Sequence, residues 1–257
     1  MRRRQFISLL GGAATSPIAW PLAARAQQAT KVPAIGILGS GTPATQGHWY
    51  AAFVQRLREL GWIDGRTVAI EYRWAEGRDE RAAEIAAEFV QRKVDVIVTS
   101  ATAGAVAAKQ ATSIVPIVFA AAGDPVGTGL VASLARPGGN ATGLSVQQTE
   151  TTGKRLELLR EVVPGLRRLA ILANVGNPVV VLDMREVQAT ARTLGLEVIT
   201  LEIRRGEDIA PAFETLKGRA GAFYVAADPL MNTHRIRINT LALAARSPFG
   251  KGWKWEV

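Results

Sequence analysis

The sequence predicts an α/β protein with two doubly wound lobes, each built around a parallel sheet. Three observations support this fold class. Short apolar runs alternate with amphipathic segments from residue 31 onward, a dense turn cluster divides this series into two halves, and 257 residues is the length of two ordinary domains. Repeated strand–helix–strand units form right-handed crossovers, which place helices on both faces of an open sheet.

Most of the expected strands are short and rich in Val, Ile and Leu, with little polar alternation. Continuous apolar runs of this kind are typical of a parallel sheet that is covered on both faces. In chain order, the expected strands are residues 32–38, 67–74, 94–99, 115–120, 168–173, 197–203 and 220–226.

Between the strands, apolar residues recur at helical spacing. Two of the helices are expected to stop at Gly61 and Gly195, because glycine readily adopts the left-handed conformation that ends a helix. Trp49 fits the first core stripe, although a place beside a ligand is also open for it. The expected core stripes are Trp49, Phe53, Leu57 and Leu60, then Ala82, Ile85, Ala86 and Phe89, and in the second half Met184, Val187, Ala191 and Leu194.

A turn cluster at residues 135–140, Ala-Arg-Pro-Gly-Gly-Asn, marks the division between the two halves. The polar, extended segment 141–149 follows it and is expected to cross between the lobes. We therefore predict an N-terminal lobe at residues 31–142 and a C-terminal lobe at residues 143–246.

Residues 1–26 have the pattern of a cleaved export signal. A basic head at residues 1–4 precedes a weakly apolar stretch at 6–22, and small residues lie at cleavage spacing before Ala26. Residues 3–7 resemble the twin-arginine export motif, although the flanking residues depart from it. The apolar stretch is interrupted by glycine, serine and proline and is too weak for a stable membrane span. We therefore expect cleavage near Ala26 and a periplasmic mature chain.

Charge and cysteine usage narrow the classes of function. The formal net charge is +9, but four of the 31 basic residues lie in the expected leader, which leaves 27 basic against 22 acidic residues, or +5. These basic residues are scattered, whereas a nucleic-acid surface needs clustered Lys and Arg. The chain has no cysteine, which excludes disulfides, thiolate metal ligands and a lipid-modified Cys at the cleavage site.

Polar loops follow the expected strands at their carboxyl ends, where open parallel sheets bind ligands. Hydroxyls, amides and helix N-termini suit a small zwitterion, because free N–H groups bind a carboxylate and an Asp binds an ammonium group. Helix capping and turn formation are the competing explanation for each of these residues. The loops are residues 39–42, 100–102, 123–125, 174–178 and 228–229.

Signals for catalysis are weak. Residues 39–44 fit the loose dinucleotide pattern, but Pro43 removes one N–H from the turn that would hold a pyrophosphate. No Gly-x-Ser-x-Gly motif is present, and His48 and His234 lie far apart without metal-ligand spacing. We therefore expect no enzyme, no cofactor and no metal site.

Seven segments, in order along the chain, match one protein family. They are residues 60–66 (LGWIDGR), 70–77 (IEYRWAEG), 116–119 (PIVF), 123–126 (GDPV), 129–140 (GLVASLARPGGN), 154–159 (KRLELL) and 228–230 (DPL). Together they resemble the ABC transporter substrate-binding proteins related to tryptophan- and tyrosine-binding carriers. The similarity runs from about residue 32 to residue 246 and covers most of the expected mature chain.

The resemblance implies a type I periplasmic-binding fold, in which a ligand between the lobes closes them about a hinge. It implies a monomeric solute-binding subunit that carries a small ligand, with amino acids as the family-based expectation, to an ABC permease in the inner membrane. Ser100 and Thr102 would bind a carboxylate, and Asp124 or Asp228 an ammonium group. By position, the cleft residues are Ser40, Ser100, Thr102, Asp124, Asn174, Asn177 and Asp228.

The sequence departs from this family after Arg246. Relatives continue with a Leu-Pro step, another strand and further units, whereas residues 247–257 have neither a strand nor a helix pattern. We therefore expect a C-terminally truncated chain with an aberrant tail. Its second lobe would be incomplete and less stable, with an exposed apolar face and impaired ligand binding.

Two other functions stay open at this point. A nucleotide-binding α/β enzyme would need a phosphate loop without Pro43. A ligand-sensing domain of the same fold would hand its ligand to a receptor, and permease and ATPase genes beside this one would favour transport over sensing.

Overall fold

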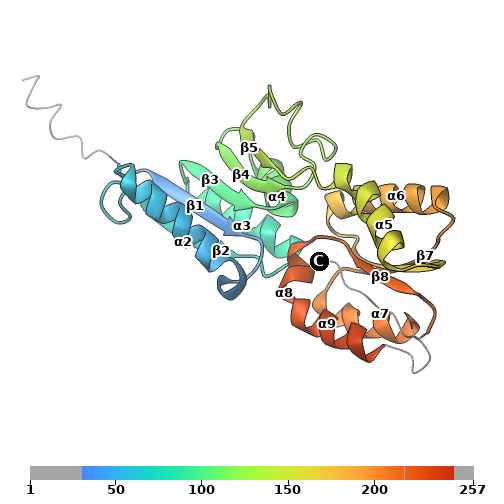
Figure 1. Cartoon of the computed structure of the whole chain (residues 1–257). Coiled ribbons are helices and arrows are strands. Elements are labelled where there is room, and N and C mark those ends of the chain that lie inside the picture. Colours follow the sequence, from blue (N-terminus) through green and yellow to red (C-terminus); the bar gives the residue numbers. More distant parts are fainter. Residues whose placement is uncertain (1–30, 217, 246–257) are drawn as a thin grey trace, which may run out of the picture. The chain divides into compact units, whose positions relative to one another are not determined.

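The computed structural model describes residues 31–216 and 218–245 (Figure 1). Residues 33–216 and 218–245 belong to one compact unit, which contains two parallel sheets. The α/β class with two doubly wound lobes is thus confirmed. The expected export signal (1–26) and the aberrant tail (247–257) lie outside the described residues.

The first sheet has five parallel strands in the order β2-β1-β3-β4-β5 (Figure 1). Such an order reverses direction between β1 and β3, so the loops after these two strands diverge and leave a crevice. The strands are β1 (Ala34–Gly39), β2 (Ala69–Trp74), β3 (Val96–Ser100), β4 (Ile117–Ala122) and β5 (Ala141–Ser145).

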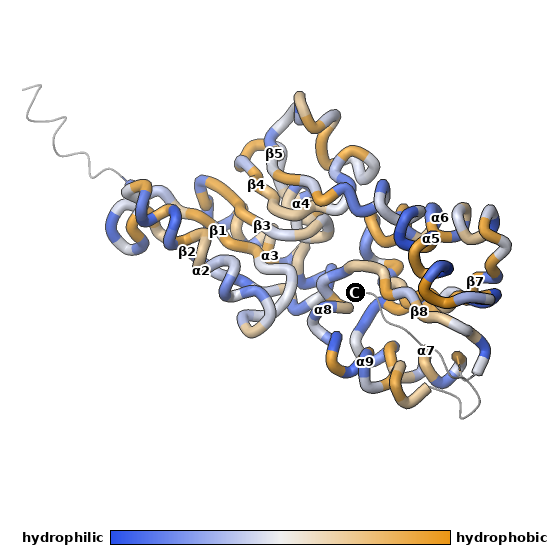
Figure 2. The backbone as a smooth tube through the Cα atoms, in the orientation of Figure 1, coloured by the Kyte–Doolittle hydropathy of each residue, from blue (hydrophilic) through white to orange (hydrophobic). Residues whose placement is uncertain are grey.

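Helices cover both faces of this sheet. On one face, α2 (Pro43–Glu59) packs through Tyr50 against the strands, and on the other α3 (Asp79–Gln91) and α4 (Thr102–Ala111) pack through Phe89 and a set of alanines. Hydrophobic residues follow one another along β1 and β3 (Figure 2). This continuity agrees with strands that are buried on both sides.

The second sheet has three parallel strands in the order β7-β6-β8, so its direction reverses between β6 and β8. Helices α5 and α6 cover one face, while α7, α8 and α9 cover the other. The elements are β6 (Arg168–Asn174), β7 (Glu197–Ile203), β8 (Ala222–Val225), α5 (Thr152–Val162), α6 (Pro178–Thr193), α7 (Ile209–Leu216), α8 (Pro229–Thr233) and α9 (Arg235–Ala244), with 3-10 turns at Thr149–Thr151 and Gly206–Asp208.

All seven expected strands are present, with ends displaced by two residues or fewer. Gly61 and Gly195 follow their helices with φ of 89° and 68°, in the left-handed region that glycine favours. The stripe on α3 and most of the stripe on α6 are buried as expected.

The core stripe expected on α2 is wrong at its ends. Trp49 is 52% exposed and Leu60 is 59% exposed, while Tyr50 and Gln46 are buried instead. The buried face is therefore rotated by one residue from Trp49 to Tyr50. Hydrogen bonding favours burial of Tyr50 in addition to apolar packing, since its hydroxyl has buried partners on β1 and β3, as described below.

The segment expected to cross between the lobes begins as a strand. Residues 141–145 form β5, which pairs with β4 at the edge of the first sheet. The lobe boundary near residue 142 stays a prediction, and β5 runs across that position.

Candidate functional site

At the switch point of the first sheet, the ends of β1 and β3 are joined by hydroxyl groups. The Ser40 hydroxyl donates to the Ser100 carbonyl oxygen. The Tyr50 hydroxyl donates to Ser100 Oγ at 2.9 Å and to the Leu38 carbonyl at 3.3 Å. Burial raises the pKa of Tyr50, so the phenol stays protonated and acts as a donor. This hydroxyl cluster is polar and uncharged.

Thr102 follows the same strand end and ties two loops together. Its Oγ1 accepts a hydrogen bond from the backbone N–H of Gly123 at 2.9 Å, and the side chain is buried at the start of α4. The residue between Ser100 and Thr102 is strained, because Ala101 has φ 64° and ψ 169°. That region is populated almost only by glycine. The strain lies directly at the crevice.

The switch point of the second sheet contains a buried carboxylate instead. Asp228 caps α8 by accepting from the Leu230 N–H at 2.7 Å. Asn177 Nδ2 donates to Asp228 Oδ2 at 2.8 Å, and Asn174 Nδ2 lies 3.3 Å from the same oxygen. Burial raises the pKa of Asp228, and the Asn177 amide, the Leu230 N–H and the Asn174 amide oppose this rise. Asn177 also caps α6 through Val179 N.

Asp124 does not join either cluster. Its Oδ1 accepts from the Gly127 N–H at 2.7 Å, and the Thr149 hydroxyl lies 3.2 Å from its Oδ2. These contacts are those of a turn-forming Asp, the structural role that competes with ligand binding for this residue type.

The two switch points meet in a small cavity. Ser40, Gly77 and Asp79 line it from the first lobe, and Asp228 and Pro229 line it from the second. Its volume is about 10 Å³, which is room for about one water molecule. The structure therefore brings the strand ends of both lobes together, with Ser40 and Asp228 on opposite walls.

Sequence reasoning missed Asp79, which begins α3 just after β2. Burial, followed by the charges of Asp228 and Glu80, raises its pKa to about 6, while an Asn174 amide and Arg204 oppose the rise. The strand-end rule that selected the other residues, applied to β2, would have found it. Asp79 and Asp228 thus form a pair of carboxylates at the contact between the lobes.

Two glycines allow the lobes to approach so closely. A Cβ on Gly77 would lie 2.8 Å from the Leu230 Cα, and a Cβ on Gly176 would lie 2.6 Å from Asp79 Oδ2. Both distances are shorter than a Cβ atom tolerates, so a side chain at Gly77 would displace the Leu230 backbone, and one at Gly176 would displace the Asp79 carboxylate.

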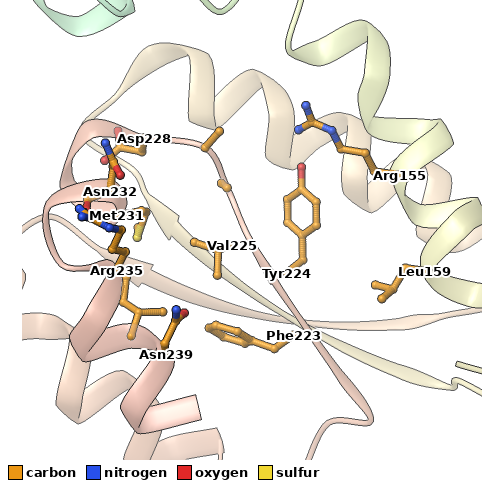
Figure 3. A pocket seen from close by; sticks show the side chains of 13 residues that line it. Arg155, Leu159, Phe223, Tyr224, Val225, Asp228, Met231, Asn232, Arg235 and Asn239 are labelled. Atoms are coloured by element: carbon orange, nitrogen blue, oxygen red, sulfur yellow. The ribbon is translucent and has the colours of Figure 1, made fainter. Parts of the chain in front are cut away.

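A much larger groove of about 740 Å³ runs along β8 (Figure 3). Its floor is Phe223, Tyr224 and Val225, with Arg155 from α5 on one wall and Asn239 from α9 on the other. In the part of the chain that the structure describes, β8 pairs only with β6, so its other edge faces this groove. The groove is an open sheet edge, and the polar switch points lie outside it except for Asp228.

Behind this groove, two hydroxyl groups donate hydrogen bonds to a buried carboxylate. Asp183 of α6 accepts hydrogen bonds from the Thr152 hydroxyl and, at 3.2 Å, from the Tyr224 hydroxyl. Burial raises the pKa of Asp183, and it also raises that of Tyr224, to about 12, with the Asp183 charge as the second cause. Figure 3 shows the Tyr224 hydroxyl directed toward Arg155. This network holds α5, α6 and β8 together.

Residues 31–216 and 218–245 contain neither a metal-binding cluster nor a membrane-spanning helix. No three His, Asp or Glu side chains in that part of the chain are grouped so that they could hold a metal ion. Within the same residues, no helix combines the length and the apolar character that crossing a bilayer requires.

Two doubly wound lobes that meet at the carboxyl ends of their strands define the class of two-lobed binding proteins with a type I periplasmic-binding fold. The model of the ABC transporter substrate-binding protein family matches residues 44–249. The chain belongs to this family.

Similar proteins include a tyrosine-binding protein and a domain crystallised with L-Trp. The chain is 30% identical over 179 residues to a tyrosine-binding protein of Clostridioides difficile (strain R20291), which covers 70% of this chain and 51% of that protein. The chain thus spans about half the length of this curated relative. Among crystal structures, a conserved domain protein of Vibrio cholerae superposes with a TM-score of 0.76 at 26% identity, covering 85% of this chain and 73% of its own. An ABC domain from Streptococcus pneumonia in complex with L-Trp has a TM-score of 0.73 at 25% identity, with 84% and 72% covered.

Proposed function

We propose that this chain is the solute-binding component of an ABC importer and captures a small ligand, an amino acid, between its lobes. Family membership supports the class of function. The position of the ligand site is supported by one observation. The two switch points meet, because Ser40 and Asp228 line one cavity from opposite lobes. The Ser40 hydroxyl and the Asp79 carboxylate of the first lobe face the buried Asp228 carboxylate across that cavity, and hydroxyl and carboxylate groups together suit a zwitterion.

Amino acids are the favoured ligands because the descriptions of two relatives name an amino acid. One is named a tyrosine-binding protein, and another was crystallised with L-Trp. In this proposal Ser40, Ser100, Thr102, Asn174, Asn177 and Asp228 line the ligand site, whereas the contacts of Asp124 favour a structural role. The protein is a monomer, carries out no chemistry on its ligand, binds no nucleic acid, and delivers the ligand to an inner-membrane permease after export to the periplasm.

The competing nucleotide-binding enzyme is disfavoured by the loop after β1. Gln46 Oε1 accepts from the Gly41 N–H at 2.8 Å, and Thr45 Oγ1 accepts from the Thr42 N–H at 3.0 Å. These are the amides that would have to hold a pyrophosphate. They are already occupied by the protein's own helix cap.

A thermal-shift screen of the purified chain against the common amino acids and small carboxylates tests the function, and calorimetry then measures the affinity. We expect Ser100→Ala and Thr102→Ala each to weaken binding of the best ligand by about tenfold, the value of one lost hydrogen bond. Thr215→Ala removes an exposed hydroxyl of α7 and serves as the control. Unchanged affinity in both variants would remove these residues from the site, and a screen without any ligand would contradict the proposed function.

A further inference from the structure

The contact between the lobes brings together two acidic side chains that no hydrogen bond links directly. Asp79 comes from the start of α3, and Asp228 caps α8. Both line the same cavity of about 10 Å³, and the Asp228 charge opposes ionisation of Asp79. Two carboxylates that line one cavity repel each other, and burial strengthens the repulsion because it reduces screening by water.

The two carboxylates differ in how well their charge is supported. Asp228 accepts from Asn177 Nδ2, the Leu230 N–H and Asn174 Nδ2, so it has several donors. Asp79 has only the Asn174 amide among its stabilising hydrogen-bond partners. Asp79 is therefore the member of the pair whose charge is more costly when the lobes touch.

Other charged groups around Asp79 act in both directions, and Arg78 lines the same cavity. Glu80, its neighbour on α3, adds a second negative charge, and Arg204, just after β7, opposes it. Arg78, the residue before α3, lies 3.6 Å from Glu76 and is half exposed. Gly176 of the second lobe also lies close to Asp79, since a Cβ built on it would be 2.6 Å from Asp79 Oδ2.

We propose that Asp79 is a specificity-determining residue that makes lobe closure depend on a positive charge beside the Asp79–Asp228 pair. In the empty protein that charge is a proton on the pair. In the loaded protein it is a cationic group of the ligand, which rests on the proposed function and restricts the ligands to those that carry an amine.

The direction of the pH effect follows from linkage. Separation of the lobes returns Asp79 toward its ordinary pKa of 3.8, whereas contact raises it to about 6. The closed form therefore binds more protons than the open form, so closure is favoured as the pH falls from about 7 toward about 4. Over this range the ratio of closed to open protein rises by at most about 100-fold, the limit set by the two pKa values.

The first experiment needs no ligand. The chain contains no cysteine, so Arg58→Cys in α2 and Thr193→Cys in α6 place one dye on each lobe for energy-transfer measurements. We expect the closed fraction of the parent to rise as the pH falls from about 7 to about 5. Asp79→Asn should be closed already at neutral pH and insensitive to pH. Glu84→Gln, which removes an exposed charge of the same helix that does not act on Asp79, should keep the parent's response.

A second variant keeps the proposal testable if Asp79→Asn does not fold. Gly77→Ala places a methyl group 2.8 Å from the Leu230 Cα of the other lobe and should hold the lobes apart at every pH. Should either folded variant retain the parent's full pH response, the proposal is overturned.

The second experiment compares L-tryptophan with indole-3-propionate, which lacks the amine. We expect only L-tryptophan to close the parent at neutral pH, and we expect Asp79→Asn to reduce this preference about tenfold. Equal binding of both compounds by the parent would overturn the ligand half of the proposal. If neither compound binds, the proposed ligand class fails, and the ligand-free pH response still decides the role of Asp79.

Discussion

The two lobes have the same strand order at their centres, but different polar side chains follow these strands. In both, the first strand of the lobe lies between the second and the third, so the loops after the first and third strands diverge. The first lobe joins these loops with the hydroxyls of Ser40, Ser100 and Tyr50. The second joins them with a carboxylate and two amides, at Asp228, Asn174 and Asn177. Topology thus determines where polar groups converge, and residue identity determines the charge of each half.

The lobes also differ in how completely their sheets are flanked. The first sheet continues beyond the switch point through β4 and β5. In the second, as far as the described residues go, β8 is the edge strand and borders a groove of about 740 Å³. Fewer strand pairings and an open edge leave the second lobe with less support for a similar arrangement of helices. We expect it to be the less stable of the two.

Matched truncations in the two cores have the largest expected effect on this comparison. Ile97 of β3 and Ile171 of β6 are both fully buried, and replacing either by Ala should cost about 2–5 kcal/mol. If the second lobe unfolds first, Ile171→Ala lowers the denaturant midpoint of the first transition and Ile97→Ala lowers that of the second. Hydrogen exchange followed by mass spectrometry assigns each transition to a lobe.

One cooperative transition that both truncations lower equally would break the comparison. The lobes would then unfold as a unit, and the open edge of β8 would have no separate energetic consequence.

Helix caps provide a smaller contrast. Thr42 caps α2 at the surface of the first lobe, and Thr42→Ala should cost about 1 kcal/mol. Asn177 caps α6 while buried, and it also donates to Asp228 at 2.8 Å. Asn177→Ala therefore removes a cap and a hydrogen bond to a charged group, at a cost of about 3 kcal/mol.

Urea titration of both cap variants measures this difference. Equal losses in the two variants would mean that Asp228 finds another donor, such as water, when Asn177 is removed.

The strand series was predictable because each strand is a local pattern. Residues 197–203 were expected as a strand and form β7 with the same bounds, since an apolar run between turn signals needs no distant partner to be recognised. The convergence of Ser40 with Ser100, and of Asn174 with Asp228, followed from one rule about the carboxyl ends of parallel strands.

The sequence predictions failed where a residue far away in the sequence determines the local structure. Periodicity placed Trp49 in the core, but Tyr50 is buried instead, because its hydroxyl reaches Ser100, 50 residues away. Asp79 has an ordinary position at the start of a helix, and only the approach of Gly176 from the other lobe gives it an unusual environment. The pairing of residues 141–145 with β4 likewise depends on the edge that β4 leaves open.

The smallest expected effect concerns backbone strain, which the first lobe carries at its switch point. Ala101 has φ 64° and ψ 169° between Ser100 and Thr102, whereas Ala227, in the loop before the α8 cap, has a negative φ. Ala101→Gly should stabilise the protein by about 1 kcal/mol because glycine accepts this conformation, and Ala227→Gly should destabilise it by about 0.5 kcal/mol through the entropy of the unfolded chain. Thermal melting of the two variants gives the sign of each change. Loss of stability in both would mean that packing of the Ala101 methyl group outweighs the strain, and the two switch points would then differ in charge but not in conformational cost.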